Sequence, residues 1–179
     1  MDINDSTRLS FRLMNSSDID ALWQLDQDPE VMKYITGGII STRDRIINTF
    51  IPRMQAYRNE DKGWGLWQVN LKQTDEYLGW ILVRPMNFFS DHPEADNLEL
   101  GWRFFRSSWG KGYASEAAQH IKNILAQNKA YRAFSAIAAT DNLGSINIMQ
   151  KIGMSYVKTY HHVDPLFECD IAYYQIKNR

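Results

Sequence analysis

The chain has 179 residues, enough for one domain with a substantial hydrophobic core. Its 20 Lys and Arg residues against 21 Asp and Glu residues give a formal net charge of −1, so the basic surface of a nucleic-acid-binding protein is not expected. The single cysteine, Cys169, excludes an internal disulfide framework and a multi-cysteine metal site. No apolar run approaches the roughly 20 residues that cross a bilayer. Because the polar start at residues 1–5 is also unlike a secretory signal, a cytoplasmic location without membrane attachment is expected.

Apolar residues alternate, or recur at helical spacing, along most of the chain, which predicts a series of short strands and helices. Internal repeats and Pro/Gly/Ser-rich linkers are missing, so residues 1–179 are expected to form a single domain. The order of the elements predicts a mixed α/β fold. In chain order, the predicted elements are a strand at 9–13, helical segments at 19–25, 28–34 and 42–57, strands at 65–71, 77–83 and 98–105, a helix at 114–125, a strand at 134–139, a helix at 145–151, and strands at 156–161 and 167–176.

The turn between the strand at 98–105 and the following helix is the most informative segment. At a helix N-terminus, unpaired backbone N–H groups and the positive end of the helix dipole favour a bound anion. Gly110 and Gly112 would let phosphate groups approach these N–H groups closely, although an ordinary tight turn is the alternative. Because the segment lacks the P-loop spacing and the three-glycine dinucleotide fingerprint, a nucleotide-binding protein is the weaker hypothesis.

Together with residues 98–105, the run Trp-Gly-Lys-Gly-Tyr-Ala-Ser-Glu-Ala at 109–117 resembles the coenzyme A signature of the GNAT N-acetyltransferases. The family pattern is Gln/Arg-x-x-Gly-x-Gly/Ala, and it places Gly112 and Ala114 at the two small positions. Trp109 stands at the Gln/Arg position, which removes a side-chain contact to the pyrophosphate but keeps the backbone cradle.

Further segments resemble the branch of this family related to the ribosomal-protein acetyltransferases RimJ and RimL. They are residues 7–13, residues 28–32, and the residues 141–145 and 151–154 of the second cofactor segment. The resemblance implies a GNAT fold, with a central, mostly antiparallel sheet of about six to seven strands, a splayed central pair of strands, and about four flanking helices.

The resemblance also implies acetyl-CoA as cosubstrate, no metal, and a primary amine as acceptor. The RimJ/RimL branch favours a protein N-terminal amine. A small amine such as a polyamine or an antibiotic is an alternative, as is a non-catalytic acyl-CoA-binding module. Both a monomer and a homodimer fit a chain of this size.

In this family the strand before the phosphate turn pairs through its backbone with the pantetheine arm of the cofactor. The resemblance therefore implies main-chain contacts from Trp102, Arg103 and Phe104, although the two aromatic side chains also suit a core. Asn142 is expected to hydrogen-bond the cofactor or to cap the following helix. The turn itself, which the resemblance assigns to the pyrophosphate, consists of Trp109, Gly110, Lys111, Gly112, Tyr113 and Ala114.

Acetyl transfer needs a neutral amine, donors for the thioester oxygen and a proton for the departing thiolate. Glu99 is the leading candidate for the base, acting through water, with a solvated or salt-bridged glutamate as the alternative. The main-chain N–H of Phe104 is a candidate donor for the thioester oxygen. Many members of the family use a tyrosine as the acid, but Met149 occupies that position here and cannot donate a proton. Ser145 is the expected substitute.

Two further groups of residues have a structural and a functional interpretation. His161 and His162 are neighbours on a predicted strand, so their side chains should point to opposite faces and a shared metal is not expected. Trp64, Trp67 and Trp80 suit core packing better than an acceptor pocket, although both are open.

Overall fold

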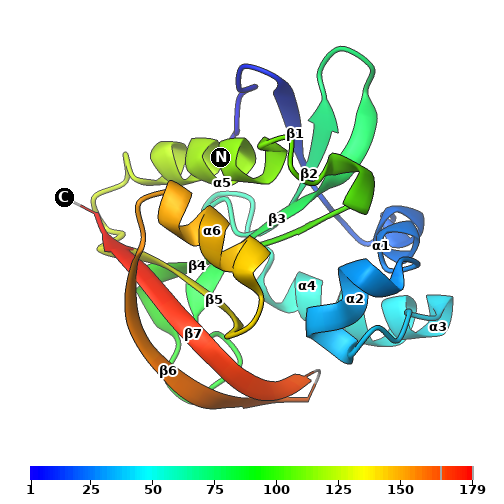
Figure 1. Cartoon of the computed structure of the whole chain (residues 1–179). Coiled ribbons are helices and arrows are strands. Elements are labelled where there is room, and N and C mark those ends of the chain that lie inside the picture. Colours follow the sequence, from blue (N-terminus) through cyan, green and yellow to red (C-terminus); the bar gives the residue numbers. More distant parts are fainter. Residues whose placement is uncertain (166, 179) are drawn as a thin grey trace.

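A computed structural model describes residues 1–165 and 167–178 of the chain. In this part of the chain, seven strands form one sheet in the order β1-β2-β3-β4-β5-β7-β6 (Figure 1). All neighbouring strands are antiparallel except the central pair β4 and β5, which is parallel. The strands are β1 (Leu9–Leu13), β2 (Gly65–Leu71), β3 (Glu76–Met86), β4 (Glu94–Phe104), β5 (Ala133–Ala139), β6 (Ser155–Asp164) and β7 (Phe167–Lys177).

The predicted mixed α/β class, with a mostly antiparallel sheet, is confirmed. Within the described residues the helices form five units, because α3, a π-helical segment and α4 follow one another without a break. The helical elements are α1 (Ile19–Leu25), α2 (Pro29–Thr36), α3 (Arg43–Arg45), the π-helical segment Ile46–Phe50, α4 (Ile51–Tyr57), the short 3-10 turn Arg106–Ser108, α5 (Tyr113–Leu125) and α6 (Leu143–Lys151). No helix of the described residues is long and apolar enough to cross a membrane.

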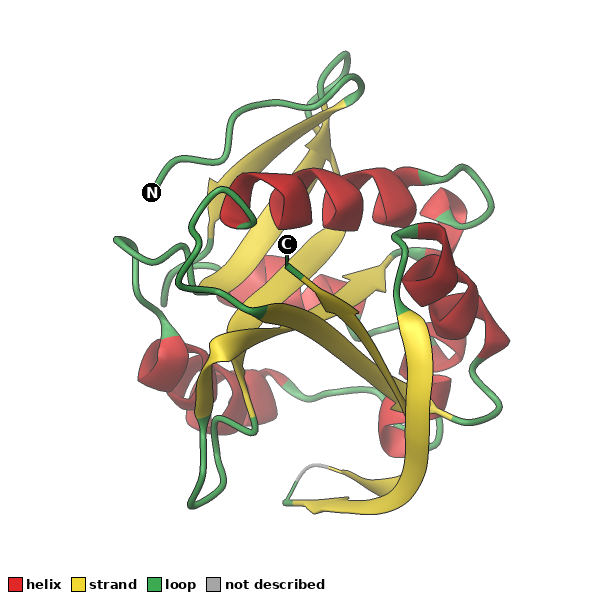
Figure 2. Ribbon diagram, turned by 90° about the vertical axis from the view of Figure 1, so that its left-hand side faces the viewer, coloured by secondary structure: helices red, strands yellow, loops and turns green. Residues whose placement is uncertain are grey.

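The central strands β4 and β5 separate part-way along their length. Their pairing is limited to residues 97–99 of β4 and 133–135 of β5. Strand β4 nevertheless continues beside β3 as far as Phe104, and β5 continues beside β7 as far as Ala139. The two halves of the sheet therefore diverge after Glu99, as Figure 2 shows, and the expected splayed pair is present.

The two faces of the sheet bury separate hydrophobic cores, because successive side chains of a strand point to opposite faces. On β3, Ile81 and Val83 join the core beneath α5 and α6, whereas Leu82 joins the core beneath α1 and the α3–α4 rod. Helix α5 contributes its apolar stripe to the first core through Ala117, Ala118, Ile121 and Leu125.

The α3–α4 rod shows how one proline shapes a helix. Thr42 caps it by accepting a hydrogen bond from the N–H of Arg45 at 3.1 Å. Pro52 lacks an N–H and cannot complete the regular ladder, and the turn just before it is π-helical, with the N–H of Ile51 bonded to the carbonyl of Ile46. The irregularity that Pro52 favours thus takes the form of a π segment.

Gly79 lies where β3 runs closest to the end of β4. Its φ of +146° is unfavourable for a side chain, and a Cβ there would lie 2.2 Å from the carbonyl oxygen of Arg103. We expect Gly79→Ala to lower the free energy of unfolding by about 3 kcal/mol or more, and the melting temperature by more than about 5 °C. Thermal unfolding followed by circular dichroism measures both.

Gly144→Ala is the matched control, because the nearest atom to its added Cβ is 3.7 Å away and alanine suits a helix. It should leave the melting temperature unchanged or raise it slightly. Equal effects of the two substitutions would contradict the close approach of the strands at Gly79.

Candidate active site

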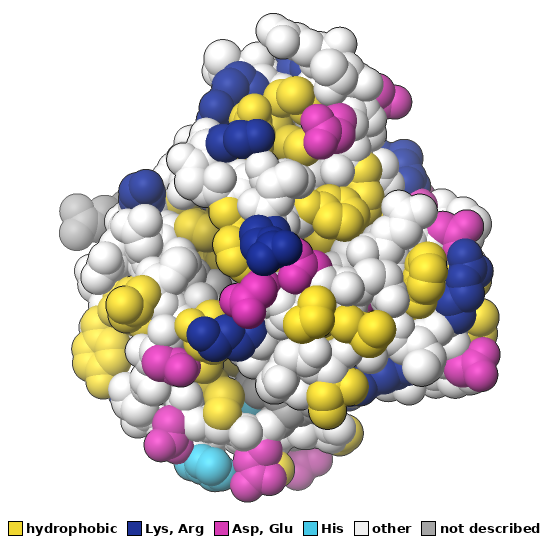
Figure 3. Space-filling view, turned by 45° about the vertical axis from the view of Figure 1, so that its right-hand side comes forward, with side chains coloured by type: hydrophobic (Ala, Val, Ile, Leu, Met, Phe, Trp, Pro, Cys, Tyr) yellow, Lys and Arg dark blue, Asp and Glu magenta, His cyan; other side chains and the backbone are white. Residues whose placement is uncertain are grey.

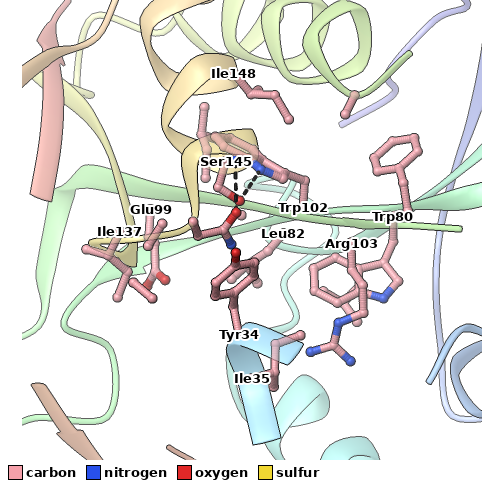
Figure 4. Close-up of a pocket in the computed structure, with 18 of the residues that line it drawn as sticks. Tyr34, Ile35, Trp80, Leu82, Glu99, Trp102, Arg103, Ile137, Ser145 and Ile148 are labelled. Carbon is pink, nitrogen blue, oxygen red and sulfur yellow. Dashed lines mark hydrogen bonds between the residues drawn. The ribbon is translucent and has the colours of Figure 1, made fainter. Parts of the chain in front are cut away.

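A cavity of about 1000 Å³ opens where β4 and β5 separate. Its walls come from β4, the end of β5, the N-termini of α5 and α6, and, on the other face of the sheet, α2 and α4. Figure 4 shows Tyr34 of α2 reaching into this space from the side opposite to Ser145 and Trp102. The gap in the sheet therefore connects a chamber under α5 and α6 with a chamber under α2 and α4.

The turn before α5 has the backbone geometry that an anion cradle requires. Gly110 and Gly112 have φ values of +73° and +78°, a backbone conformation that favours glycine. Within the described residues, the backbone N–H groups from Gly110 to Ser115 make no hydrogen bond. A Cβ at Gly110 would meet no atom within 4 Å, so the turn is open at this residue. It fits a pyrophosphate at the positive end of α5.

Arg8 and Glu116 hold this turn against β1. The Arg8 side chain binds the carbonyl of Lys111 at 3.0 Å and lies 4.5 Å over the ring of Tyr113. Its Nε donates to one oxygen of Glu116 at 2.6 Å, while the backbone N–H of Arg8 and the hydroxyl of Ser6 donate to the other. Burial alone would raise the pKa of Glu116, but these hydrogen bonds hold it below its ordinary value. Neither residue was predicted as part of the site.

The edge of β4 presents main-chain groups to the gap. The N–H of Phe105 donates to the carbonyl of Leu78 at 3.0 Å, which fixes the antiparallel register of β3 and β4. Alternation then turns the main-chain groups of Trp102 and Phe104 toward the gap, and those of Arg103 toward β3. Of the three residues expected to contact the pantetheine arm, two therefore have main-chain groups in position. The Arg103 side chain instead pairs with the buried Asp26 of the α1–α2 connection.

Trp109 occupies the position of the family's Gln or Arg. Its indole N–H donates to the carbonyl of Phe104 at 2.9 Å, while 48% of the residue remains exposed. The last carbonyl of β4 is therefore hydrogen-bonded to Trp109, whereas the N–H of Phe104 faces the gap without a partner from Trp109. Lys111 beside it has an exposed side chain, and Tyr113 and Ala114 line the cavity from the first turn of α5.

Asn142 and Ser145 meet at the start of α6. The Asn142 side chain accepts a hydrogen bond from the N–H of Ser145 at 3.1 Å, so it caps the helix, and it also lines the cavity. The Ser145 hydroxyl accepts a hydrogen bond from the indole N–H of Trp102 at 3.2 Å (Figure 4). Because the oxygen serves as an acceptor there, its own hydrogen is available to a group in the cavity. Met149, one turn further on, is fully buried in the core and takes no part in the cavity wall.

Glu99 lies on the other face of β4, where the gap begins. It is only 6% exposed, and its two oxygens accept hydrogen bonds from Arg84 at 2.8 and 3.1 Å. The side chain lines the cavity and is salt-bridged, as the alternative interpretation predicts, and its role as the base stays a prediction. A bidentate pair of this kind keeps the carboxylate oriented.

Comparison with known proteins identifies this architecture. Residues 8–155 match the family model described as an acetyltransferase (GNAT) domain. The chain belongs to the GNAT acetyltransferase family. It is 33% identical to YkkB of Bacillus subtilis (strain 168) over 155 residues, covering 85% of this chain and 84% of YkkB. It is 31% identical to the N-acetyltransferase YnaD of the same organism, over 82% of this chain and 79% of YnaD.

Solved structures agree with this assignment. A GNAT-family acetyltransferase from Bacillus anthracis has 26% identity and a TM-score of 0.76, with 97% of both chains covered. RimL, an alpha-N-acetyltransferase of ribosomal protein L7/L12 solved with coenzyme A, shares the fold at 16% identity and a TM-score of 0.74 over 98% of this chain and 97% of RimL. The aminoglycoside acetyltransferase AAC(6')-Ib shares it at 14% identity and a TM-score of 0.74 over 94% of each chain. The chain is an N-acetyltransferase of the acetyl-CoA-dependent GNAT family.

The chamber under α2 and α4 contains residues that the sequence did not single out. Tyr57 of α4 and the loop residues Phe88 and Phe89 bring three rings together, and Arg53 and Arg84 lie against them. Arg53 also pairs with Asp164 at the end of β6, at 2.9 Å. Of these residues, the adjacent Phe88 and Phe89 in a polar loop were the ones that the sequence could have marked as candidates for an apolar site.

The tryptophan and histidine candidates differ in whether they line the cavity. Trp64 and Trp67 are buried in the core of the acetyltransferase, whereas Trp80 lines the cavity.

His162 also lines the cavity, and burial lowers its pKa. His161 is exposed, and hydrogen bonds with Asp170 and Glu168 raise its pKa. The two histidines point to different surroundings, as alternation predicts, and no group of three metal-ligating side chains occurs among the described residues.

The lowered pKa of Glu116 predicts a pH-dependent stability. The contribution of its ion pair is fully present above the ordinary carboxyl pKa and is lost as the pH falls through the lowered value. We expect Glu116→Gln to cost about 1 kcal/mol at pH 7, or about 2–4 °C in melting temperature, with the difference from the parent shrinking below about pH 4. Thermal unfolding between pH 3 and pH 8 measures this.

The exposed Glu76, at the start of β3 and outside the cradle, provides the control Glu76→Gln. Glu116→Gln should also weaken acetyl-CoA binding several-fold, because Arg8 would hold the turn less firmly, and Glu76→Gln should not. A Glu116→Gln effect on melting temperature that stayed constant down to pH 3 would contradict the proposed ion pair.

Proposed function

We propose that this acetyltransferase moves the acetyl group of acetyl-CoA directly to the N-terminal amine of a protein in a ternary complex. One observation carries the proposal: a row of unpaired amides, a free strand edge, Ser145 and Glu99 all meet at the single gap between β4 and β5. Cofactor and acceptor can then approach the gap from opposite faces of the sheet.

The cosubstrate would occupy the chamber under α5 and α6. Its pyrophosphate would bind the N–H groups of residues 110–114, which need no side-chain charge for this purpose. Its pantetheine arm, which carries amide groups, would pair with the free edge of β4 beside Trp102 and Phe104. The thioester would then lie next to Ser145 and the N–H of Phe104, and Asn142 would face the arm from the start of α6.

The reaction would run as an addition followed by an elimination. The neutral amine attacks the thioester carbon, a C–N bond forms, and the N–H of Phe104 stabilises the negative charge on the oxygen. As the C–S bond breaks, the Ser145 hydroxyl gives its proton to the thiolate and takes a proton back from solvent, to which Glu99 later releases the proton that it receives. The nitrogen loses its extra proton through water to Glu99, whose oxygens each keep a second acceptor site beside Arg84.

Ser145→Ala tests the acid. We expect kcat to fall about 10- to 100-fold, with little change in the KM for acetyl-CoA, because the hydroxyl acts only when the C–S bond breaks. Steady-state release of coenzyme A, followed with a thiol reagent, measures both constants. Ser155→Ala, at an exposed serine on β6, is the matched control and should behave as the parent. An unchanged kcat in Ser145→Ala would assign the proton to another donor.

Peptides test the acceptor. A peptide with a free N-terminus and no lysine should become acetylated, and its N-terminally blocked counterpart with one internal lysine should not. Mass spectrometry of both products, with acetyl-CoA in excess, decides between α- and ε-amines. Modification of the lysine alone would overturn the N-terminal assignment.

A small free amine is the second candidate acceptor. The ion pair between Arg53 of α4 and Asp164 of β6 joins two elements across the wall of the cavity, and a compact molecule would fit inside such a wall. RimL is described as a protein N-terminal acetyltransferase and AAC(6')-Ib as an aminoglycoside acetyltransferase, so the shared fold serves both kinds of acceptor. Turnover of free amines without turnover of any peptide would favour this candidate.

A further inference from the structure

The acceptor chamber has an aromatic wall. The rings of Tyr57, Phe88 and Phe89 pack edge to face, with centroids 5.1 to 6.2 Å apart. The neighbouring wall residues Met54, Leu82 and Met86 are apolar. A ligand held by this wall buries apolar surface and gains little from additional charges.

Guanidinium groups already lie over two of these rings, Tyr57 and Phe89. The guanidinium of Arg53 lies 3.9 Å over the ring of Phe89, and that of Arg84 lies 5.6 Å over Tyr57 and 5.4 Å over Phe89. A ring that already holds a guanidinium repels a second cation in the same position. Burial raises the pKa of Tyr57 to about 12, so its phenol also stays neutral and supplies no negative charge.

The charged side chains around the cavity are balanced. Among the described residues that line it, four are acidic and five are Lys or Arg. Three of the acidic residues are held by arginines, in the pairs Asp26–Arg103, Glu99–Arg84 and Asp164–Arg53. The fourth, Glu30, is exposed at the surface. Figure 3 shows the same mixture on the side of the molecule that carries α1–α4, where acidic and basic side chains lie beside one another.

We infer that the acceptor presents one amine on an apolar, preferably aromatic, body, and is not a polycation. This inference rests on the proposed acetyl transfer and narrows its substrate class. A polyamine or an aminoglycoside carries several ammonium groups, and each needs an unpaired carboxylate or a free ring face. Three of the four carboxylates already bind arginines, Glu30 lies at the outer surface, and guanidinium groups already lie over Tyr57 and Phe89. A polycation therefore finds few partners in the chamber, whereas the aromatic wall accepts an uncharged hydrophobic group.

The same chemistry can come from two sources, a free arylalkylamine or a peptide whose first residue is apolar. The experiment therefore uses 2-phenylethylamine and a peptide amide that begins with Phe, set against spermidine, kanamycin and the same peptide beginning with Lys. Coenzyme A release at saturating acetyl-CoA gives kcat/KM for each amine. We expect kcat/KM to be at least 10-fold higher for 2-phenylethylamine than for spermidine or kanamycin, and at least 10-fold higher for the Phe peptide than for the Lys peptide. The higher value of the two apolar acceptors identifies the source, a free amine or a peptide. A preference for spermidine or kanamycin would overturn the inference.

Phe89→Ala locates the preference on the aromatic wall. It should raise the KM for the favoured amine about 10-fold and leave the KM for acetyl-CoA unchanged. Tyr156→Ala, which removes an exposed ring of β6 outside the cavity, is the matched control and should change neither constant. An unaltered amine KM in Phe89→Ala would place the acceptor elsewhere.

Failure of the proposed function is recognisable separately. In that case none of the amines would cause release of coenzyme A. Calorimetric titration of 2-phenylethylamine and spermidine into the protein saturated with coenzyme A would then still decide the acceptor class. Tighter binding of 2-phenylethylamine supports the inference even without turnover, and tighter binding of spermidine overturns it.

Discussion

The loss of pairing between β4 and β5 after Glu99 is the constraint on which the rest of the site depends. A buried strand edge without partners is costly, because each main-chain donor or acceptor that loses its partner costs about 1–3 kcal/mol. In the proposed function, the half-buried edge of β4 would pair with a ligand that carries amides and lies along it. The N-terminus of α5 begins where this edge ends, so one extended molecule can satisfy both sets of donors.

The acceptor side depends on ion pairs between distant segments. Asp26–Arg103 joins the first helices to β4, Glu99–Arg84 joins β4 to β3, and Asp164–Arg53 joins the end of β6 to α4. Buried pairs of this kind contribute little net stability, because desolvation offsets their attraction. Their effect is orientation: they fix the walls of the chamber and leave it electrically balanced.

Local patterns were enough to predict the strands and the turn before α5. Alternation identifies β1 and β2, and two glycines before a helical stripe identify the turn, since both signals lie in neighbouring residues. The assignment of this turn to a pyrophosphate rests on the resemblance to the family and stays a prediction. The partners of Glu99 and Asp164 were not predictable, because Arg84 and Arg53 come into contact only through strand register and helix packing. The same holds for Arg103. Which of its main-chain groups face β3 depends on the hydrogen-bonding register, and the sequence pattern does not contain that register.

The two departures from the family pattern, Trp109 and Met149, change side chains and leave the main-chain path of β4 intact. Trp109 replaces a polar side chain, yet its indole N–H closes the carbonyl of Phe104 and leaves the neighbouring N–H free. Met149 replaces a proton donor and fills the core, while Trp102 holds the Ser145 hydroxyl at the cavity, one helical turn away. In both cases a tryptophan N–H donates a hydrogen bond beside the gap, to the carbonyl of Phe104 in one and to the hydroxyl of Ser145 in the other. A site that relies on main-chain donors can accept such changes, because the donors are set by the path of β4 and by the start of α5.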